Sequence, residues 1–232
     1  MKSVHGLGYY VHSGKSDHEA PVLLFLHGVG ECFFNEKNRQ QIGPKSLFEQ
    51  SVPKRLADAS PDHPLRTSFI LIAPQLPDRE TPWINVVDEL KEILVSHCSK
   101  RTKLYIIGFS KGGLGAFQVS DQLRADAMVT IDASPMNQHA KEASNEWVKQ
   151  PPPFWAIHTS YRQDERFRKI QDFNELLTQQ IHKGLDVSPA AQTRSRTCEP
   201  APTGTEGVER HVWICDQAST SAAPYHWLLQ HG

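Results

Sequence analysis

The chain has 232 residues, of which 25 are basic and 26 acidic. This balance argues against a strongly charged surface for nucleic acid or for an anionic membrane, and it favours a small neutral or modestly charged ligand. The length fits a single domain over residues 1–232, and no segment resembles a signal peptide or a membrane span, so we expect a cytoplasmic protein.

Four scattered cysteines lack Cys-x-x-Cys spacing, which predicts free thiols and argues against a zinc site or a redox pair. In chain order, residues 3–12 read as a weak edge strand and residues 21–26 as a strand buried on both faces. A helix is expected around residues 44–56, a second buried strand over 68–73 and an amphipathic helix over 83–97.

The central pattern spans residues 104–117, where an apolar run ends in Gly108-Phe109-Ser110-Lys111-Gly112 and continues as a helix. Strand, sharp turn and helix around Gly-x-Ser-x-Gly are typical of a nucleophile elbow with Ser110 at its tip. The glycines on either side of the serine are needed where a Cβ would clash in the tight turn. The alternative is a Gly/Ser-rich loop without catalytic function.

The remaining pattern predicts strands over 127–131 and 153–158, a helix over 166–182, a loop over 188–207 and a closing helix over 222–230. A short strand is expected near 194–198 inside that loop. Strands that alternate with helices predict an α/β fold with a mostly parallel sheet and helices on both faces.

A glycine-rich turn, His27-Gly28-Val29-Gly30, follows the strand over residues 21–26. Ligands of open α/β sheets bind at such carboxyl ends of strands. The backbone N–H groups of Val29 and Lys111 are therefore predicted to form an oxyanion hole. The alternative is an ordinary turn in which His27 is a packing residue.

A serine nucleophile needs a histidine base that is oriented by an acid, in the chain order Ser, Asp or Glu, His. That order favours His211, which follows the loop; the alternative places it within a strand over 208–215. For the acid, Asp164 comes after the strand over 153–158, and Asp132 occupies the equivalent place one strand earlier. Glu165 and Asp172, which lie near Asp164 in the chain, are further candidates, and any of the four is alternatively a surface carboxylate.

The chain resembles the α/β-hydrolase superfamily, and within it the esterases of the phospholipase/carboxylesterase, depolymerase and feruloyl-esterase type. The matching segments are residues 26–31, 72–75, 108–115, 155–158, 211–213 and 227–229. The resemblance implies Ser110 as nucleophile, His211 as base and the oxyanion hole at Val29 and Lys111. It also places substrate contacts at His27, Gly28, Phe33 and Trp213.

Three departures from the family pattern concern the site. Thr159 replaces a glycine and the first Asp comes two residues late, which makes Asp164 an irregular match. Lys111 places a cation near the oxyanion, and the apolar Cys32-Phe33-Phe34 suits an acyl pocket. The sequence thus predicts a serine esterase with a small-molecule substrate and no cofactor or metal. The alternatives are a thioesterase or peptidase with the same site, or a ligand-binding protein with little turnover.

Overall fold

The computed structural model describes residues 2–13, 20–35, 40–41, 43–48, 51–97, 102–133, 152–158, 194–197 and 207–231. Its centre is an eight-stranded sheet with the order β1-β2-β6-β3-β7-β8-β9-β10. The strands are β1 Lys2–Val4, β2 Leu7–Ser13, β3 Val22–Leu26, β6 Ile70–Gln75, β7 Leu104–Phe109, β8 Ala127–Ile131, β9 Phe154–His158 and β10 Arg194–Thr197. Strands β6 to β10 in this order run parallel, whereas β1 and β2 pair antiparallel at one edge.

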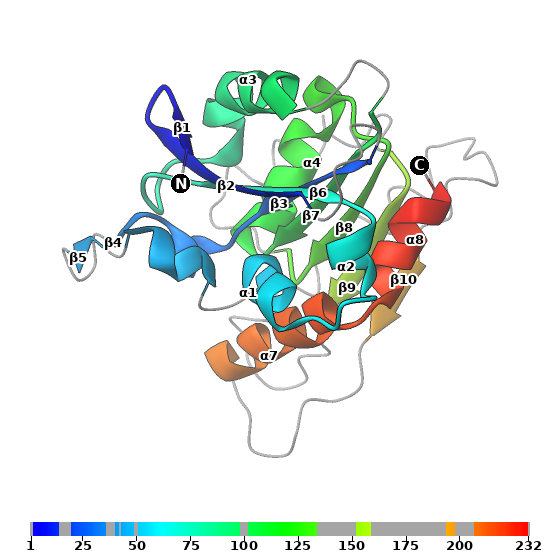
Figure 1. Cartoon of the computed structure of the whole chain (residues 1–232). Coiled ribbons are helices and arrows are strands. Elements are labelled where there is room, and N and C mark those ends of the chain that lie inside the picture. Colours follow the sequence, from blue (N-terminus) through cyan, green and yellow to red (C-terminus); the bar gives the residue numbers. More distant parts are fainter. Residues whose placement is uncertain are drawn as a thin grey trace, which may run out of the picture.

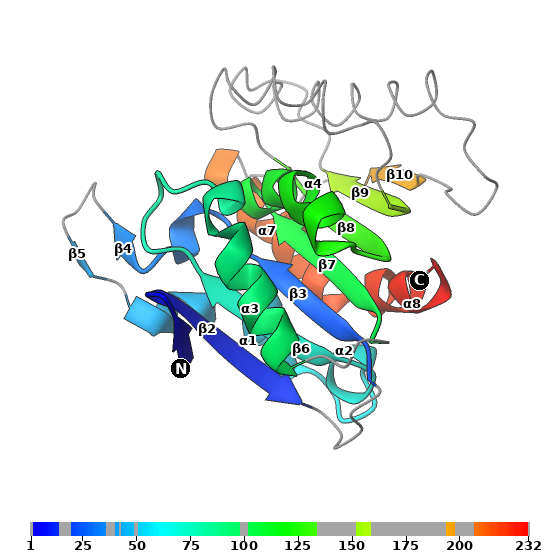
Figure 2. The ribbon, with the colours of Figure 1, turned by 90° about the horizontal axis from the view of Figure 1, so that it is seen from above.

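Helices cover both faces of the sheet (Figure 1). One face carries η3 Trp83–Val86, α3 Val87–His97 and α4 Lys111–Leu123, and the other carries α1 Ser51–Asp58, α7 Gly207–Thr220 and α8 Ala223–His231. In Figure 2, α3 and α4 lie in front of the sheet and cover the face turned toward the viewer. The shorter elements are η1 Val29–Glu31, β4 Phe34–Asn35, β5 Gln40–Gln41, η2 Gly43–Phe48 and α2 Pro64–Thr67.

The continuous apolar runs divide their side chains between two cores. In β3, Leu24 and Leu26 join the core beneath α3 and α4, while Leu23 and Phe25 join the core beneath α1, α7 and α8. All four side chains are fully buried. Alternating residues of a strand point to opposite faces, so a sheet covered on both sides needs apolar residues at every position.

The expected fold class, an α/β fold with a mostly parallel sheet and helices on both faces, is confirmed. Two elements differ from expectation. The single edge strand is a β1–β2 hairpin, because the chain turns at His5 and Gly6, both with positive φ (46° and 88°). The helix expected over 44–56 is divided into η2 and α1. The helix expected over 166–182 lies outside the described residues, and the single domain remains a prediction.

Candidate active site

Ser110 occupies the turn between β7 and α4, as the elbow pattern predicts. Its backbone angles, φ 55° and ψ −115°, lie in a region that residues with a side chain rarely adopt. Such a conformation costs on the order of 1–3 kcal/mol and persists only where the surroundings enforce it. Its N–H donates to Ile131 O at 2.8 Å, and its hydroxyl makes no cap hydrogen bond to α4. The elbow is thus held by its backbone, and the hydroxyl is not used to cap the helix.

The two glycines beside Ser110 are required by close packing, which confirms the reason given for them. A Cβ at Gly112 would lie 1.8 Å from Leu26 O, and a Cβ at Gly108 would lie 2.2 Å from Gly112 O. Both distances are far below any real contact, and in each case the obstructing atom is backbone. The start of α4 can therefore approach the ends of β7 and β3 only with glycine at these positions.

Asp132 lies beside Ser110 at the end of the neighbouring strand. Phe109 of β7 is in register with Ile131 of β8, so the residues that follow them leave the sheet side by side. Asp132 also has a positive φ, 44°, and its N–H donates to Ile157 O at 2.8 Å. Its side chain is fully buried.

The Asp132 carboxylate binds His211 from α7. The distance between Asp132 Oδ2 and His211 Nδ1 is 3.0 Å, and the imidazole is 15% exposed. The His211 ring also packs on Phe109, the residue before Ser110, with ring centroids 4.7 Å apart. An imidazole that donates its Nδ1–H to a carboxylate has its acceptor lone pair on Nε2, as a general base requires.

His211 lies in a helix, so the alternative that placed it within a strand over 208–215 was wrong. Residues 207–220 form α7 because Ile214, Cys215 and Ala218 recur at helical spacing and enter the core against β8. An ion pair fastens this helix to α1, with Arg55 Nη2 2.7 Å from Asp216 Oδ1. The packing of α7 therefore determines where the imidazole lies.

The sequence preferred a different acid. Asp164, Glu165 and Asp172 lie outside the described residues, so the structure gives no distance for them. Asp132, the alternative, contacts His211. The sequence feature that pointed to Asp132 is its position directly after the strand over 127–131, which pairs with the strand before Ser110.

The turn predicted to form the oxyanion hole lies against the nucleophile. A Cβ added to Gly28 would lie 3.2 Å from Ser110 Cβ. Gly28 N–H donates to the buried Glu31 Oε2 at 3.0 Å, and Glu31 O accepts from Gln75 Nε2 at 2.8 Å. Val29 and Lys111 are the first residues of η1 and α4, where N–H groups have no acceptor within the helix. Their role as oxyanion donors remains a prediction.

The side chain of Lys111 is buried and turned to the loop after β6. Its Nζ donates to Arg79 O. Burial lowers the pKa of Lys111, while the nearby Cys32, Asp78 and Glu80 partly oppose this shift. The ammonium group that the sequence placed near the oxyanion is thus hydrogen-bonded to the loop after β6.

His27 supports the turn, and both of its ring nitrogens are hydrogen-bonded within the protein. Its contact with a substrate remains a prediction. The ring is fully buried; Nε2 accepts from Leu76 N–H at 2.9 Å, and Nδ1–H donates to Gly28 O at 2.6 Å. The structure shows His27 as a buried packing residue, which is the alternative given for it.

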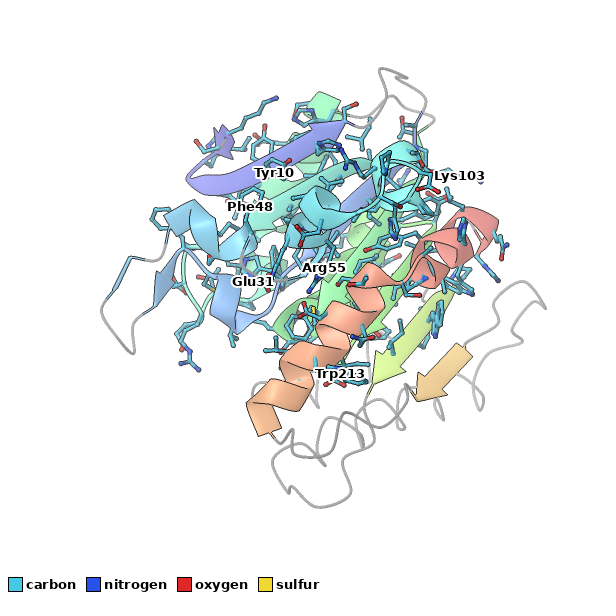
Figure 3. The ribbon with its side chains drawn as sticks, turned by 60° about the horizontal axis from the view of Figure 1, so that its bottom comes forward. Tyr10, Glu31, Phe48, Arg55, Lys103 and Trp213 are labelled. Carbon is cyan, nitrogen blue, oxygen red and sulfur yellow. The ribbon has the colours of Figure 1, made fainter. Side chains whose placement is uncertain are left out.

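Of the other predicted contacts, Phe33 is half-buried beyond η1. Trp213 is also half-buried, on α7, where Figure 3 labels it. It packs against the core on that face of the sheet.

The buried His27 predicts a loss of stability in acid. Burial lowers its pKa to about 4, so between pH 6.5 and 4 the unfolded chain binds a proton that the folded chain does not. We expect the free energy of unfolding to fall across this range by up to about 3 kcal/mol from this group. Urea unfolding at several pH values measures it. His27→Gln is expected to flatten the dependence, and His226→Gln, an exposed position on α8, serves as control. Equal slopes in all three proteins would contradict the assignment.

Within the described ranges, no three His, Cys, Asp or Glu side chains gather as metal ligands would. Cys32 and Cys215 are buried thiols, and burial raises the pKa of Cys32 to about 12. None of the described helices is long and apolar enough to cross a membrane.

No protein-family model matches the sequence, and no curated protein matches it. Solved structures do match. Est1E from Butyrivibrio proteoclasticus is similar with a TM-score of 0.60 at 13% identity, covering 98% of this chain and 96% of that one. An esterase from Pyrobaculum calidifontis also has a TM-score of 0.60 at 13% identity, covering 96% and 85%. MPT51 from Mycobacterium tuberculosis has a TM-score of 0.58 at 9% identity, covering 97% and 94%. Together with the strand order and the elbow, these likenesses show that the chain has the α/β-hydrolase fold.

Proposed function

We propose that this protein is a serine hydrolase that cleaves carboxylic esters, with Ser110 as nucleophile, His211 as base and Asp132 as the orienting acid. The observation that carries the proposal is the 3.0 Å contact between Asp132 and His211, made beside the strained turn that presents Ser110. Burial of Asp132 supports this role, because a buried carboxylate needs a partner and fixes the orientation of the imidazole it binds.

The reaction follows from these positions. Ser110 Oγ attacks the ester carbonyl while His211 Nε2 takes the hydroxyl proton, and the carbonyl oxygen becomes an oxyanion. The N–H groups of Val29 and Lys111 would donate to that oxygen. Collapse of the intermediate breaks the C–O bond, and the proton on His211 passes to the leaving alcohol. A water molecule, activated by the same imidazole, then hydrolyses the acyl-enzyme and regenerates Ser110.

The names of the similar structures favour an ester, rather than a thioester or a peptide, as the bond that is cleaved. One similar structure is named as an esterase, from Pyrobaculum calidifontis, and one of the two Est1E structures is described with ferulic acid bound. The identities of 10–13% mean that this support concerns the class of bond and not the particular acid or alcohol.

The test combines turnover with covalent trapping. The protein is assayed with p-nitrophenyl esters from acetate to palmitate, and it is incubated with a fluorophosphonate, which adds to an activated serine; intact mass then reports the adduct. We expect ester turnover and one adduct that Ser110→Ala abolishes. Ser120→Ala, which changes a buried serine of the same helix, is the matched control and should keep both. Neither turnover nor adduct in the unchanged protein would overturn the proposal, and a Ser110-dependent adduct without turnover would favour a ligand-binding protein.

A further inference from the structure

Lys111 comes directly after the nucleophile, and its side chain is not used in the proposed mechanism. It is the first residue of α4 and is only 6% exposed, so an ammonium group is buried beside the candidate site. Its Nζ donates to Arg79 O, in the loop over residues 76–82 that joins β6 to η3, which we call the β6–η3 loop. Burial of a charge is unfavourable for folding, and a single backbone carbonyl offsets only part of that cost. Stability alone therefore does not explain a lysine at this position.

The β6–η3 loop is held at its start by the turn that carries Val29. Leu76 N–H donates to His27 Nε2 at 2.9 Å, and Leu76 O accepts from Phe33 N–H at 2.9 Å. His27 also donates from Nδ1 to Gly28 O at 2.6 Å. These hydrogen bonds are made on both sides of Val29 in the chain. The start of the loop thus fixes the turn whose N–H is predicted to bind the oxyanion.

The middle of the loop is folded so that Arg79 O is presented to the ammonium group. Asp78 Oδ1 accepts from the N–H groups of Glu80 and Thr81 at 2.9 and 2.7 Å, and from the Thr81 hydroxyl at 2.8 Å. Hydrogen bonds from an Asp side chain to the backbone just after it close a tight turn, which here has Arg79 inside it. The carbonyl that binds Lys111 therefore belongs to an ordered turn.

The loop leads into a side chain that packs on both parts of the site. Trp83, at the start of η3, is fully buried and lies edge-on to His27 with ring centroids 5.0 Å apart. A Cβ added to Gly115 would lie 2.3 Å from Trp83 Cδ1, so the indole packs directly on α4. One segment, the loop with Trp83, thus contacts both the turn at Val29 and the helix that begins at Lys111.

We propose that Lys111 is a positioning residue, whose ammonium group holds the β6–η3 loop on the nucleophile elbow and so fixes the N–H groups of Val29 and Lys111 relative to each other. This inference rests on the proposed function and adds a role for a side chain at the same site. The oxyanion forms only when Ser110 attacks, and donors that are already in place stabilise it without rearrangement. The side chain is therefore expected to act on the transition state and little on substrate binding.

The test replaces Lys111 by methionine, which has nearly the same length but neither the charge nor the donor. We expect kcat for p-nitrophenyl acetate to fall about ten- to a hundredfold and KM to change less than about twofold, because misplaced donors weaken only the transition state. The midpoint of urea unfolding should stay the same or rise, because a buried charge has been removed. A lysine that served the fold alone would give the opposite result, a lower midpoint with kcat retained.

Two further variants control for the change of residue. Lys111→Arg keeps a charge and a donor, and it should retain more activity than Lys111→Met. Lys103→Met makes the same change at an exposed position just before β7, at the end of that strand opposite Ser110, and it should leave kcat unchanged (Figure 3).

A trifluoromethyl ketone reports the oxyanion hole separately from turnover. Ser110 Oγ adds to its carbonyl carbon, the hydroxyl proton passes to His211 and the carbonyl oxygen becomes an anion, so the adduct resembles the tetrahedral intermediate. In Lys111→Met its inhibition constant should rise by about the factor by which kcat/KM falls.

A double variant tests whether Lys111 acts through the loop. Asp78→Ala removes the hydrogen bonds that close the turn around Arg79, and it should also lower kcat. Residues that act through one shared contact are not additive, so Lys111→Met combined with Asp78→Ala should be little worse than Lys111→Met alone.

Two failures are distinguishable. Three results would each overturn the role of Lys111 and keep the esterase: a kcat of Lys111→Met within about twofold of the unchanged protein, an unchanged inhibition constant, or losses that multiply in the double variant. If the unchanged protein neither hydrolyses an ester nor binds the ketone, the proposed function is wrong, and the inference is refuted with it.

Discussion

Replacing Ser110 by alanine is expected to lower kcat for p-nitrophenyl ester hydrolysis by a factor of about a thousand to a million. In the proposed mechanism the Ser110 hydroxyl forms the acyl-enzyme, and a water molecule at the same place is a far weaker nucleophile. Alanine keeps a Cβ in the same strained backbone, so the elbow and the Ser110-to-Ile131 backbone hydrogen bond should persist. Steady-state kinetics measure the loss, and unchanged thermal unfolding shows that the fold is intact.

The same loss is expected for His211→Ala, and the double variant should be little worse than either single one. Groups that act as one unit in a single step do not contribute independently, so their losses are not additive. Losses that multiply in the double variant would show that Ser110 and His211 do not act together. Ser120→Ala should match the unchanged protein in every assay.

The second large effect is expected for Asp132→Asn, which should lower kcat about ten-thousandfold. The amide has nearly the shape of the carboxylate, but its NH₂ group can hold the imidazole in the tautomer whose proton is on Nε2, and it cannot stabilise the imidazolium. The effect should appear in kcat, with KM little changed. Asp164→Asn, assayed beside it, should retain most of the activity. A ten-thousandfold loss in Asp164→Asn and a small one in Asp132→Asn would assign the acid to the residue that the sequence favoured.

The sequence was sufficient for the elbow because its determinants are local. An apolar run of strand length, a serine between two glycines and a helical continuation all lie within residues 104–117. The same holds for β3 and β6, whose continuous apolar runs report burial on both faces. His211 was identified from chain order alone, a rule that names the residue but not the helix on which it stands.

The acid and His27 required information that the sequence does not hold locally. Which carboxylate meets His211 depends on strand order and on how α7 packs, and both arise from contacts between distant segments. The position of His27, directly after a buried strand, is typical of a residue that contacts a ligand. Its actual role depends on the N–H of Leu76, which is 49 residues away in the chain.

His211 is held in place differently from Ser110 and Asp132. Its helix, α7, is fixed by the ion pair between Arg55 and Asp216 and by the packing of its apolar face. Ser110 and Asp132 are fixed by the sheet itself, through backbone hydrogen bonds to neighbouring strands. His211 is carried by a separate helix that meets the sheet through side chains. A displacement of α7 by a single turn would withdraw the imidazole and leave every strand in register. If the proposed function holds, a change in how α7 docks is expected to abolish ester hydrolysis while spectroscopic measures of the sheet still report a native protein.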